Sequence, residues 1–106
     1  MNDWQKICQR SEIPSGDWKQ IDVDGTTAVV YNVDGKFFAV EDICTHDGAV
    51  LSGCPLEGNE IVCPRHGARF SVISGEALSP PAFESIATFP VKVEGESIYV
   101  RDDRWD

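Results

Sequence analysis

Both histidines of this 106-residue chain stand beside a cysteine, and this pairing limits what the chain can fold into more than any other feature. The first pair is Cys44 and His46, and the second is Cys63 and His66, with sixteen residues between the two pairs. Two loops that each carry a thiolate and an imidazole can converge on one metal centre. Such a donor set suits either a tetrahedral structural zinc ion or a two-iron cluster with mixed ligands.

The segment that carries these pairs is rich in residues that form loops. Residues 41–75 contain five glycines and two prolines. Before and after it the chain is different, with short apolar runs that contain many β-branched and aromatic residues. We therefore expect a loop-bearing subdomain inserted in the middle of a β domain.

Short predicted strands account for most of the remaining sequence. Asp24-Gly25 and Asp34-Gly35 are typical of tight hairpin turns, so the first three strands form a meander. No window shows a sustained apolar period of 3.6 residues, which argues against a long helix. The pattern predicts an all-β fold, an antiparallel sandwich or barrel-like base, with strands at residues 18–23, 26–33, 36–40, 89–94 and 97–100.

Composition narrows the class of protein and its partners. The net charge is −9, with 42% apolar and 25% charged residues, which is ordinary for a globular domain of this length. An acidic surface repels phosphate, so neither nucleic acid nor an anionic membrane is an expected partner. The sequence shows neither a basic region followed by an apolar run nor a stretch of about 20 apolar residues. We expect a cytoplasmic protein and, by default, a monomer.

Spacing favours the cluster over zinc. Structural zinc sites usually take two cysteines from one loop and two histidines from another, with about two to five residues inside each pair. Here each loop supplies one cysteine and one histidine, and only Thr45 separates Cys44 from His46. Zinc modules also depend more on the metal for their core, whereas this chain has apolar strands of its own.

Each Cys/His pair and its neighbours form a short motif, called a ligand box below. The two boxes together resemble those of Rieske [2Fe–2S] proteins, and the resemblance extends over essentially the whole chain. The matching motifs are Cys44-Thr45-His46-Asp47-Gly48 and Cys63-Pro64-Arg65-His66-Gly67. The resemblance implies one [2Fe–2S] cluster per chain, with Cys44 and Cys63 on one iron and His46 and His66 on the other. It also implies a single Rieske domain over residues 1–106, with a basal part at about 1–42 and 75–106 and a cluster-binding part at about 43–74.

The resemblance further indicates a low reduction potential. Rieske proteins of respiratory complexes have an extra cysteine in each box and a serine and a tyrosine hydroxyl at the cluster. The matching positions here are Ala49, Arg65, Ala68 and Phe70, which provide neither a disulfide nor a hydroxyl. In these respects the chain is similar to the soluble Rieske-type ferredoxins of aromatic ring-hydroxylating dioxygenase systems.

That similarity implies an electron carrier rather than an enzyme. Such a ferredoxin takes single electrons from a flavin-dependent ferredoxin reductase and passes them to a terminal Rieske oxygenase. The oxygenases need a mononuclear iron held by two further histidines and a carboxylate, and this chain has only the two histidines of its boxes. We therefore expect no catalytic residue and no substrate site.

Three other functions stay open on the sequence alone. The chain could be an electron-transfer subunit of another redox system, such as the small subunit of a nitrite reductase, although relatives of that kind often lack the ligands. It could be a general ferredoxin, or a structural zinc-binding module. The remaining cysteines, Cys8 and Cys54, are interpreted as small apolar core residues, with a disulfide between them as the alternative.

Overall fold

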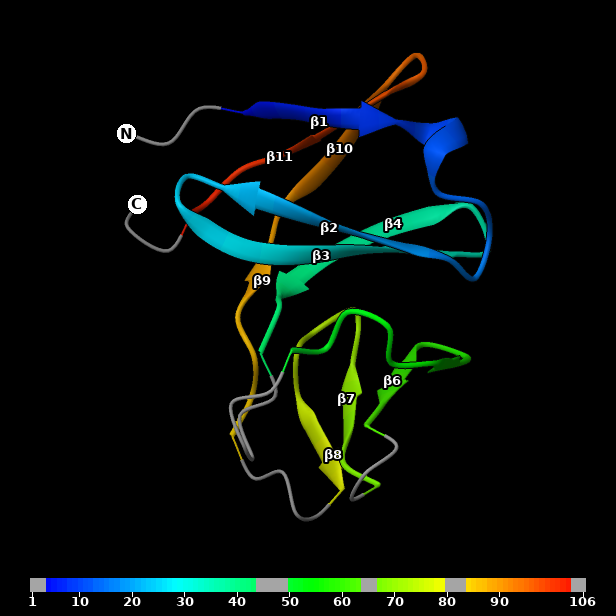
Figure 1. Cartoon of the computed structure of the whole chain (residues 1–106), viewed down its shortest axis with the longest axis vertical. Helices are drawn as coiled ribbons and strands as arrows, with labels where there is room; N and C mark the ends of the chain where they lie inside the picture. Colours follow the sequence, from blue (N-terminus) through cyan, green and yellow to red (C-terminus); the bar gives the residue numbers. More distant parts are fainter. Residues whose placement is uncertain (1–3, 44–49, 64–66, 80–83, 104–106) are drawn as a thin grey trace.

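The computed structural model describes residues 4–43, 50–63, 67–79 and 84–103, and its regular structure is almost entirely β (Figure 1). One short 3₁₀ helix, Arg10–Glu12, follows the first strand. The strands are β1 (Gln5–Gln9), β2 (Trp18–Val23), β3 (Thr26–Val33), β4 (Lys36–Glu41), β5 (Leu56–Glu57), β6 (Glu60–Val62), β7 (Arg69–Ser71), β8 (Ala77–Ser79), β9 (Thr88–Phe89), β10 (Val91–Glu94) and β11 (Ser97–Val100). In the described residues no helix is long and apolar enough to cross a membrane.

Two antiparallel sheets form the upper half of Figure 1, in the orders β1-β11-β10 and β2-β3-β4-β9. The predicted meander is confirmed, and its turns explain why. Asp24 and Gly25 have φ of 56° and 88°, and Asp34 and Gly35 have 53° and 89°. Two successive positive φ angles match the right-handed twist of the flanking strands, which is why Asp-Gly is favoured in such turns.

Strand β3 is buried on both faces, because it lies between two cores. Ala28 and Val30 face the first core, which fills the space between the two upper sheets. Val29 and Tyr31 face the second core, on the opposite side of the same strand. The continuous apolar run from Ala28 to Tyr31 in the sequence follows from this double burial.

A third sheet, ordered β5-β6-β7-β8, forms the lower half of the molecule (Figure 1). Its residues pack against the β2-β3-β4-β9 sheet through the second core. That core consists of Val29, Tyr31, Val40, Leu51, Ile61, Cys63, Ala68, Phe70, Val72 and Ile86. The all-β fold with a smaller loop-bearing part is as predicted.

One predicted strand is divided between two sheets. The run at 89–94 was expected as a single strand, but β9 pairs with β4 and β10 pairs with β11. Pro90 lies between them and has no N–H to donate to a ladder, so the hydrogen bonding changes sheets at this residue. The chain thus passes from one upper sheet to the other without a loop.

Cys8 and Cys54 are not joined by a disulfide. Cys8 is buried in the first core, whereas Cys54 packs against the second. Burial raises the pKa of the Cys8 thiol, with the carboxylate of Glu12 adding to the effect. The interpretation of both cysteines as small apolar packing residues therefore agrees with the structure.

Candidate metal centre

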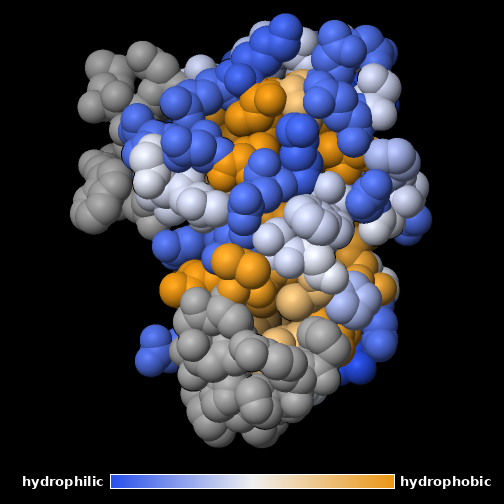
Figure 2. Space-filling model, viewed as in Figure 1, coloured by the Kyte–Doolittle hydropathy of each residue, from blue (hydrophilic) through white to orange (hydrophobic). Residues whose placement is uncertain are grey.

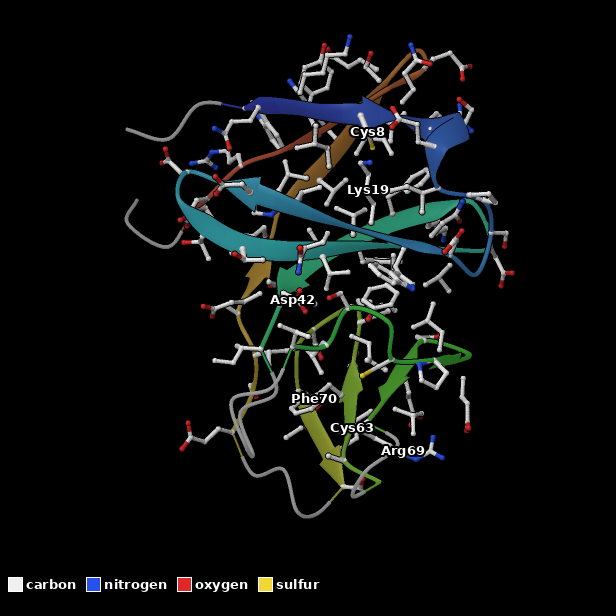
Figure 3. All side chains as sticks on the ribbon, in the orientation of Figure 1. Cys8, Lys19, Asp42, Cys63, Arg69 and Phe70 are labelled. Atoms are coloured by element: carbon white, nitrogen blue, oxygen red, sulfur yellow. The ribbon has the colours of Figure 1, made fainter. Side chains whose placement is uncertain are left out.

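Of the four expected ligands, the structure describes Cys63, while Cys44, His46 and His66 lie outside the described residues. Cys63 follows β6 directly, and only 5% of its surface is exposed. Its thiol is in no disulfide. A buried thiol at the end of a strand, next to a loop, is a soft donor that suits iron in a [2Fe–2S] cluster. The described part of the donor set fits the group, and Figure 3 places Cys63 in the lower half of the molecule.

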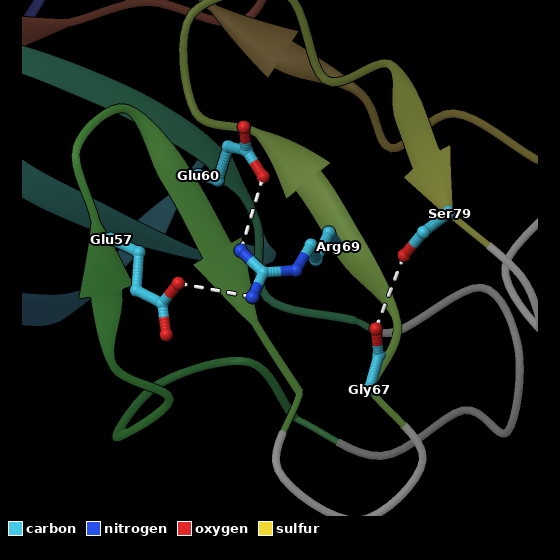
Figure 4. Close-up of polar contacts among 5 residues, drawn as sticks. All are labelled: Glu57, Glu60, Gly67, Arg69 and Ser79. Atoms are coloured by element: carbon cyan, nitrogen blue, oxygen red, sulfur yellow. Dashed lines mark hydrogen bonds and ion pairs between the residues drawn. The ribbon is translucent and has the colours of Figure 1, made fainter.

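Hydrogen bonds hold both ends of the second box. The Cys63 N–H donates to the Ala68 carbonyl at 2.8 Å, and the Gly67 N–H donates to the Cys63 carbonyl at 2.9 Å. The Ser79 hydroxyl on β8 donates to the Gly67 carbonyl at 3.1 Å (Figure 4). The backbone entering and leaving residues 64–66 is thus fixed by the third sheet.

The first box is held at its two ends by side chains from the upper sheets. Asp42, just beyond β4, accepts hydrogen bonds from the Leu51 and Ser52 N–H groups at 2.6 and 2.7 Å. The Tyr31 hydroxyl on β3 donates to the Leu51 carbonyl at 3.1 Å. Residues 44–49 therefore lie between two anchored ends.

The positions that carry hydroxyls in high-potential Rieske proteins are apolar here. Ala68 and Phe70 are fully buried in the second core, and Phe70 pairs with Ile61 in the sheet. Neither side chain can donate a hydrogen bond. The resemblance implies that these two positions lie beside the cluster, where the lack of hydroxyl donors favours a low reduction potential, because hydrogen bonds to a cluster stabilise its reduced, more negative form.

Sequence reasoning missed an ion-pair group on the third sheet. The Arg69 guanidinium lies 3.0 Å from the Glu57 carboxylate and 3.2 Å from that of Glu60 (Figure 4). The hydrogen bonds that Arg69 donates to the carboxylates of Glu57 and then Glu60 raise the pKa of Arg69. The three residues link β5, β6 and β7 across the surface, and the only sequence signal was opposite charge on neighbouring short strands.

The buried Tyr31 hydroxyl is expected to make stability fall at alkaline pH. Burial, with smaller effects of Cys54 and Asp42, raises the pKa of Tyr31 above its ordinary value of 10.0. Above pH 10 the unfolded chain releases this proton while the folded chain keeps it. The free energy of unfolding then falls with pH, by at most about 1.4 kcal/mol per pH unit for this group.

Urea unfolding of the wild type and of Tyr31→Phe between pH 9 and 11.5 measures this contribution. The wild type should lose more stability over the interval than the variant does. Equal losses in the two proteins would contradict the assignment to Tyr31.

The comparisons with known proteins agree with the geometry. A family model described as Rieske [2Fe-2S] domain matches residues 3–90. The ferredoxin component of the naphthalene 1,2-dioxygenase system of Pseudomonas aeruginosa is 43% identical over 97 residues, which are 92% of this chain and 93% of the relative.

Two solved structures extend the agreement to the fold. The complex of reduced oxygenase and oxidised ferredoxin in carbazole 1,9a-dioxygenase contains a chain that matches with a TM-score of 0.85 and 37% identity, over 92% of this chain and 91% of that one. The ferredoxin of Sphingomonas yanoikuyae B1 matches with a TM-score of 0.86 and 30% identity, over 94% and 99%. The chain therefore belongs to the Rieske [2Fe-2S] domain family and binds one [2Fe–2S] cluster.

Proposed function

We propose that this protein is a low-potential Rieske ferredoxin that carries single electrons from a flavin-dependent ferredoxin reductase to a terminal ring-hydroxylating oxygenase. The similarity to a dioxygenase ferredoxin over nearly the full length of both chains carries the proposal. A bound [2Fe–2S] cluster supplies the chemistry, because it takes up and releases one electron at a time. This similarity favours a ferredoxin over a nitrite reductase subunit or a zinc module.

We assign Cys44, His46, Cys63 and His66 as the cluster ligands. The assignment is supported by the buried Cys63 thiol and by the hydrogen bonds that fix the chain on either side of both boxes. We also divide the domain into a basal part, about 1–42 and 75–106, and a cluster-binding part, about 43–74. The pairing of β8 with β7 favours moving the second boundary past Ser79.

We further propose that the chain has no substrate site and works in the cytoplasm. Its two histidines are both used by the cluster, so none remains for a mononuclear iron of the oxygenase kind.

The surface supports brief encounters with protein partners. A net charge of −9 favours fast, salt-sensitive docking to basic surfaces. Three large apolar side chains, Val50, Ile73 and Leu78, are 58%, 51% and 42% exposed in the part of the chain around the third sheet. On the face in Figure 2, hydrophobic residues gather where the two halves of the molecule meet. A small apolar contact area surrounded by charged side chains suits a transient complex.

Reconstituted turnover tests the function. The reductase and terminal oxygenase of a naphthalene 1,2-dioxygenase system are supplied with NADH and naphthalene, with this protein as the added ferredoxin. We expect product formation to rise with its concentration and to fall as salt is raised. If the Pseudomonas aeruginosa ferredoxin supports turnover, but the reduced form of this protein transfers no electrons to the oxygenase, the proposal is wrong.

A further inference from the structure

One buried carboxylate closes the neck of the first ligand loop. Asp42 is 6% exposed and immediately precedes Ile43 and residues 44–49. Its Oδ1 atom accepts from the N–H groups of Leu51 and Ser52, on the far side of the loop, at 2.6 and 2.7 Å. A single side-chain atom thus joins the residue before the loop to the two residues after it.

The other carboxylate oxygen fixes the orientation of this side chain. Oδ2 accepts from the Gln20 side-chain amide on β2 at 2.7 Å. The same amide nitrogen lies 3.4 Å from the Ser52 hydroxyl. The Asp42 N–H in turn donates to the Thr27 carbonyl at 3.0 Å. Asp42 is therefore tied to β2 and β3 by its side chain and its backbone.

The residue after the loop is anchored just as firmly. Leu51 is fully buried in the second core. Its N–H is bound by Asp42, and its carbonyl is bound by the hydroxyl of Tyr31. Figure 3 places Asp42 where the β2-β3-β4-β9 sheet meets the lower half of the molecule. The anchor thus joins the basal sheet to the cluster-binding part.

We propose that Asp42 is a positioning residue, which closes the first ligand loop and thereby holds Cys44 and His46 in the arrangement that the cluster requires. The proposal rests on the ligand assignment above. A carboxylate suits the task, because one oxygen can accept two backbone N–H groups while the second accepts the amide. Without the carboxylate, the N–H groups of Leu51 and Ser52 lose their acceptor in a largely buried place, which destabilises the folded loop ends.

Two substitutions separate the effect of the Asp42 hydrogen-bond acceptor from the effect of its negative charge. Asp42→Asn removes the charge but keeps an oxygen for Leu51 and Ser52, and the Gln20 amide can turn to present its own oxygen to the new NH₂ group. Asp42→Ala removes both charge and acceptor. Glu94→Gln is the control for the loss of one negative charge, since Glu94 lies on β10 in the basal β1-β11-β10 sheet and its side chain is 63% exposed, with a surface ion pair to Lys92 at 3.6 Å.

Cluster loss to a chelator, amide hydrogen exchange and EPR of the reduced protein are measured on the cluster-loaded proteins. In Asp42→Ala we expect cluster loss about tenfold faster, faster exchange at Leu51 and Ser52, and a shifted EPR signal. Asp42→Asn should stay within about threefold of the wild type, and Glu94→Gln should match it. Equal effects of the alanine and asparagine variants would overturn the proposal, because charge alone would explain them. Unchanged amide hydrogen exchange at Leu51 and Ser52 in Asp42→Ala would also overturn the proposal.

Tyr31→Phe provides a test that does not depend on Asp42→Ala folding. It removes the donor to the Leu51 carbonyl but keeps the ring in the core. Faster cluster loss, with an unchanged far-UV spectrum, supports a loop held from the basal sheet; an unchanged rate overturns it. A wild type without a Rieske signal would overturn the ligand assignment as well. A normal wild type with unaffected Asp42 variants would overturn only the positioning role.

Discussion

Replacing His46 or His66 by alanine is expected to abolish the Rieske EPR signal of the dithionite-reduced protein. With neutral imidazoles, two ferric irons, two sulfides and two thiolates sum to a charge of about zero, which eases reduction and distinguishes this centre from an all-cysteine cluster. Loss of one imidazole opens a coordination position on its iron. The wild type should contain about two irons per chain and give a rhombic signal with an average g below 2.

Cysteine variants provide the matched comparison. Cys44→Ser and Cys63→Ser should lose iron and acid-labile sulfide together with the signal. Cys54→Ser should retain both, because Cys54 lies outside the boxes and packs beside the second core. An unchanged spectrum in either histidine variant would refute the ligand assignment. A colourless wild type with about one zinc per chain would identify a structural zinc module instead.

The local features of the fold were predictable because they depend on neighbours in the sequence. Asp24-Gly25 and Asp34-Gly35 specify hairpin turns by themselves, and the strands that they join follow from their apolar residues. The division at Pro90 could also have been predicted, because proline cannot donate inside a ladder. The short strands of the third sheet could not, since two or three residues carry too little pattern.

The residues that anchor the ends of the first ligand box could not be predicted from the sequence, for a different reason. Asp42 reads as one more acidic residue in a chain with 18 of them, and its partners lie 9, 10 and 22 residues away. Tyr31 reads as an ordinary strand residue until β3 is seen to lie between two cores. The two boxes predict which residues bind the cluster, but only the packing of the sheets shows which residues anchor the chain on either side of each box.

Gly75→Ala is expected to cause the largest loss of stability of any single methyl addition among the glycines that the structure describes. Gly75 has φ of 78°, and a Cβ there would lie 2.1 Å from the Ile86 carbonyl oxygen and 3.1 Å from Thr88 Cγ2. The Gly75 carbonyl accepts from the Ile86 N–H at 2.8 Å, and its own N–H donates to the Ser71 carbonyl at 2.8 Å. This glycine therefore joins the turn after β7 to the segment before β9.

The loss of stability expected for Gly75→Ala has two contributions. A left-handed conformation costs a residue other than glycine about 1–2 kcal/mol. Moving the Ile86 backbone away from the new methyl group disturbs the hydrogen bond between the two segments, for about 1–3 kcal/mol more. The free energy of unfolding should therefore fall by about 2–5 kcal/mol, and the cluster-binding part should separate from β9 first.

Gly58→Ala is the control that isolates the contact from the backbone angle. Gly58 has φ of 63°, yet a Cβ there meets nothing within 4 Å. Only the conformational cost applies, so this variant should lose about 1–2 kcal/mol. Urea unfolding of the wild type and both variants, followed by far-UV circular dichroism and by the visible absorbance of the cluster, measures the difference. If the two alanine variants unfold at the same urea concentration, the approach of Gly75 to Ile86 does not join the two parts of the molecule, and the link must be sought in the second core alone.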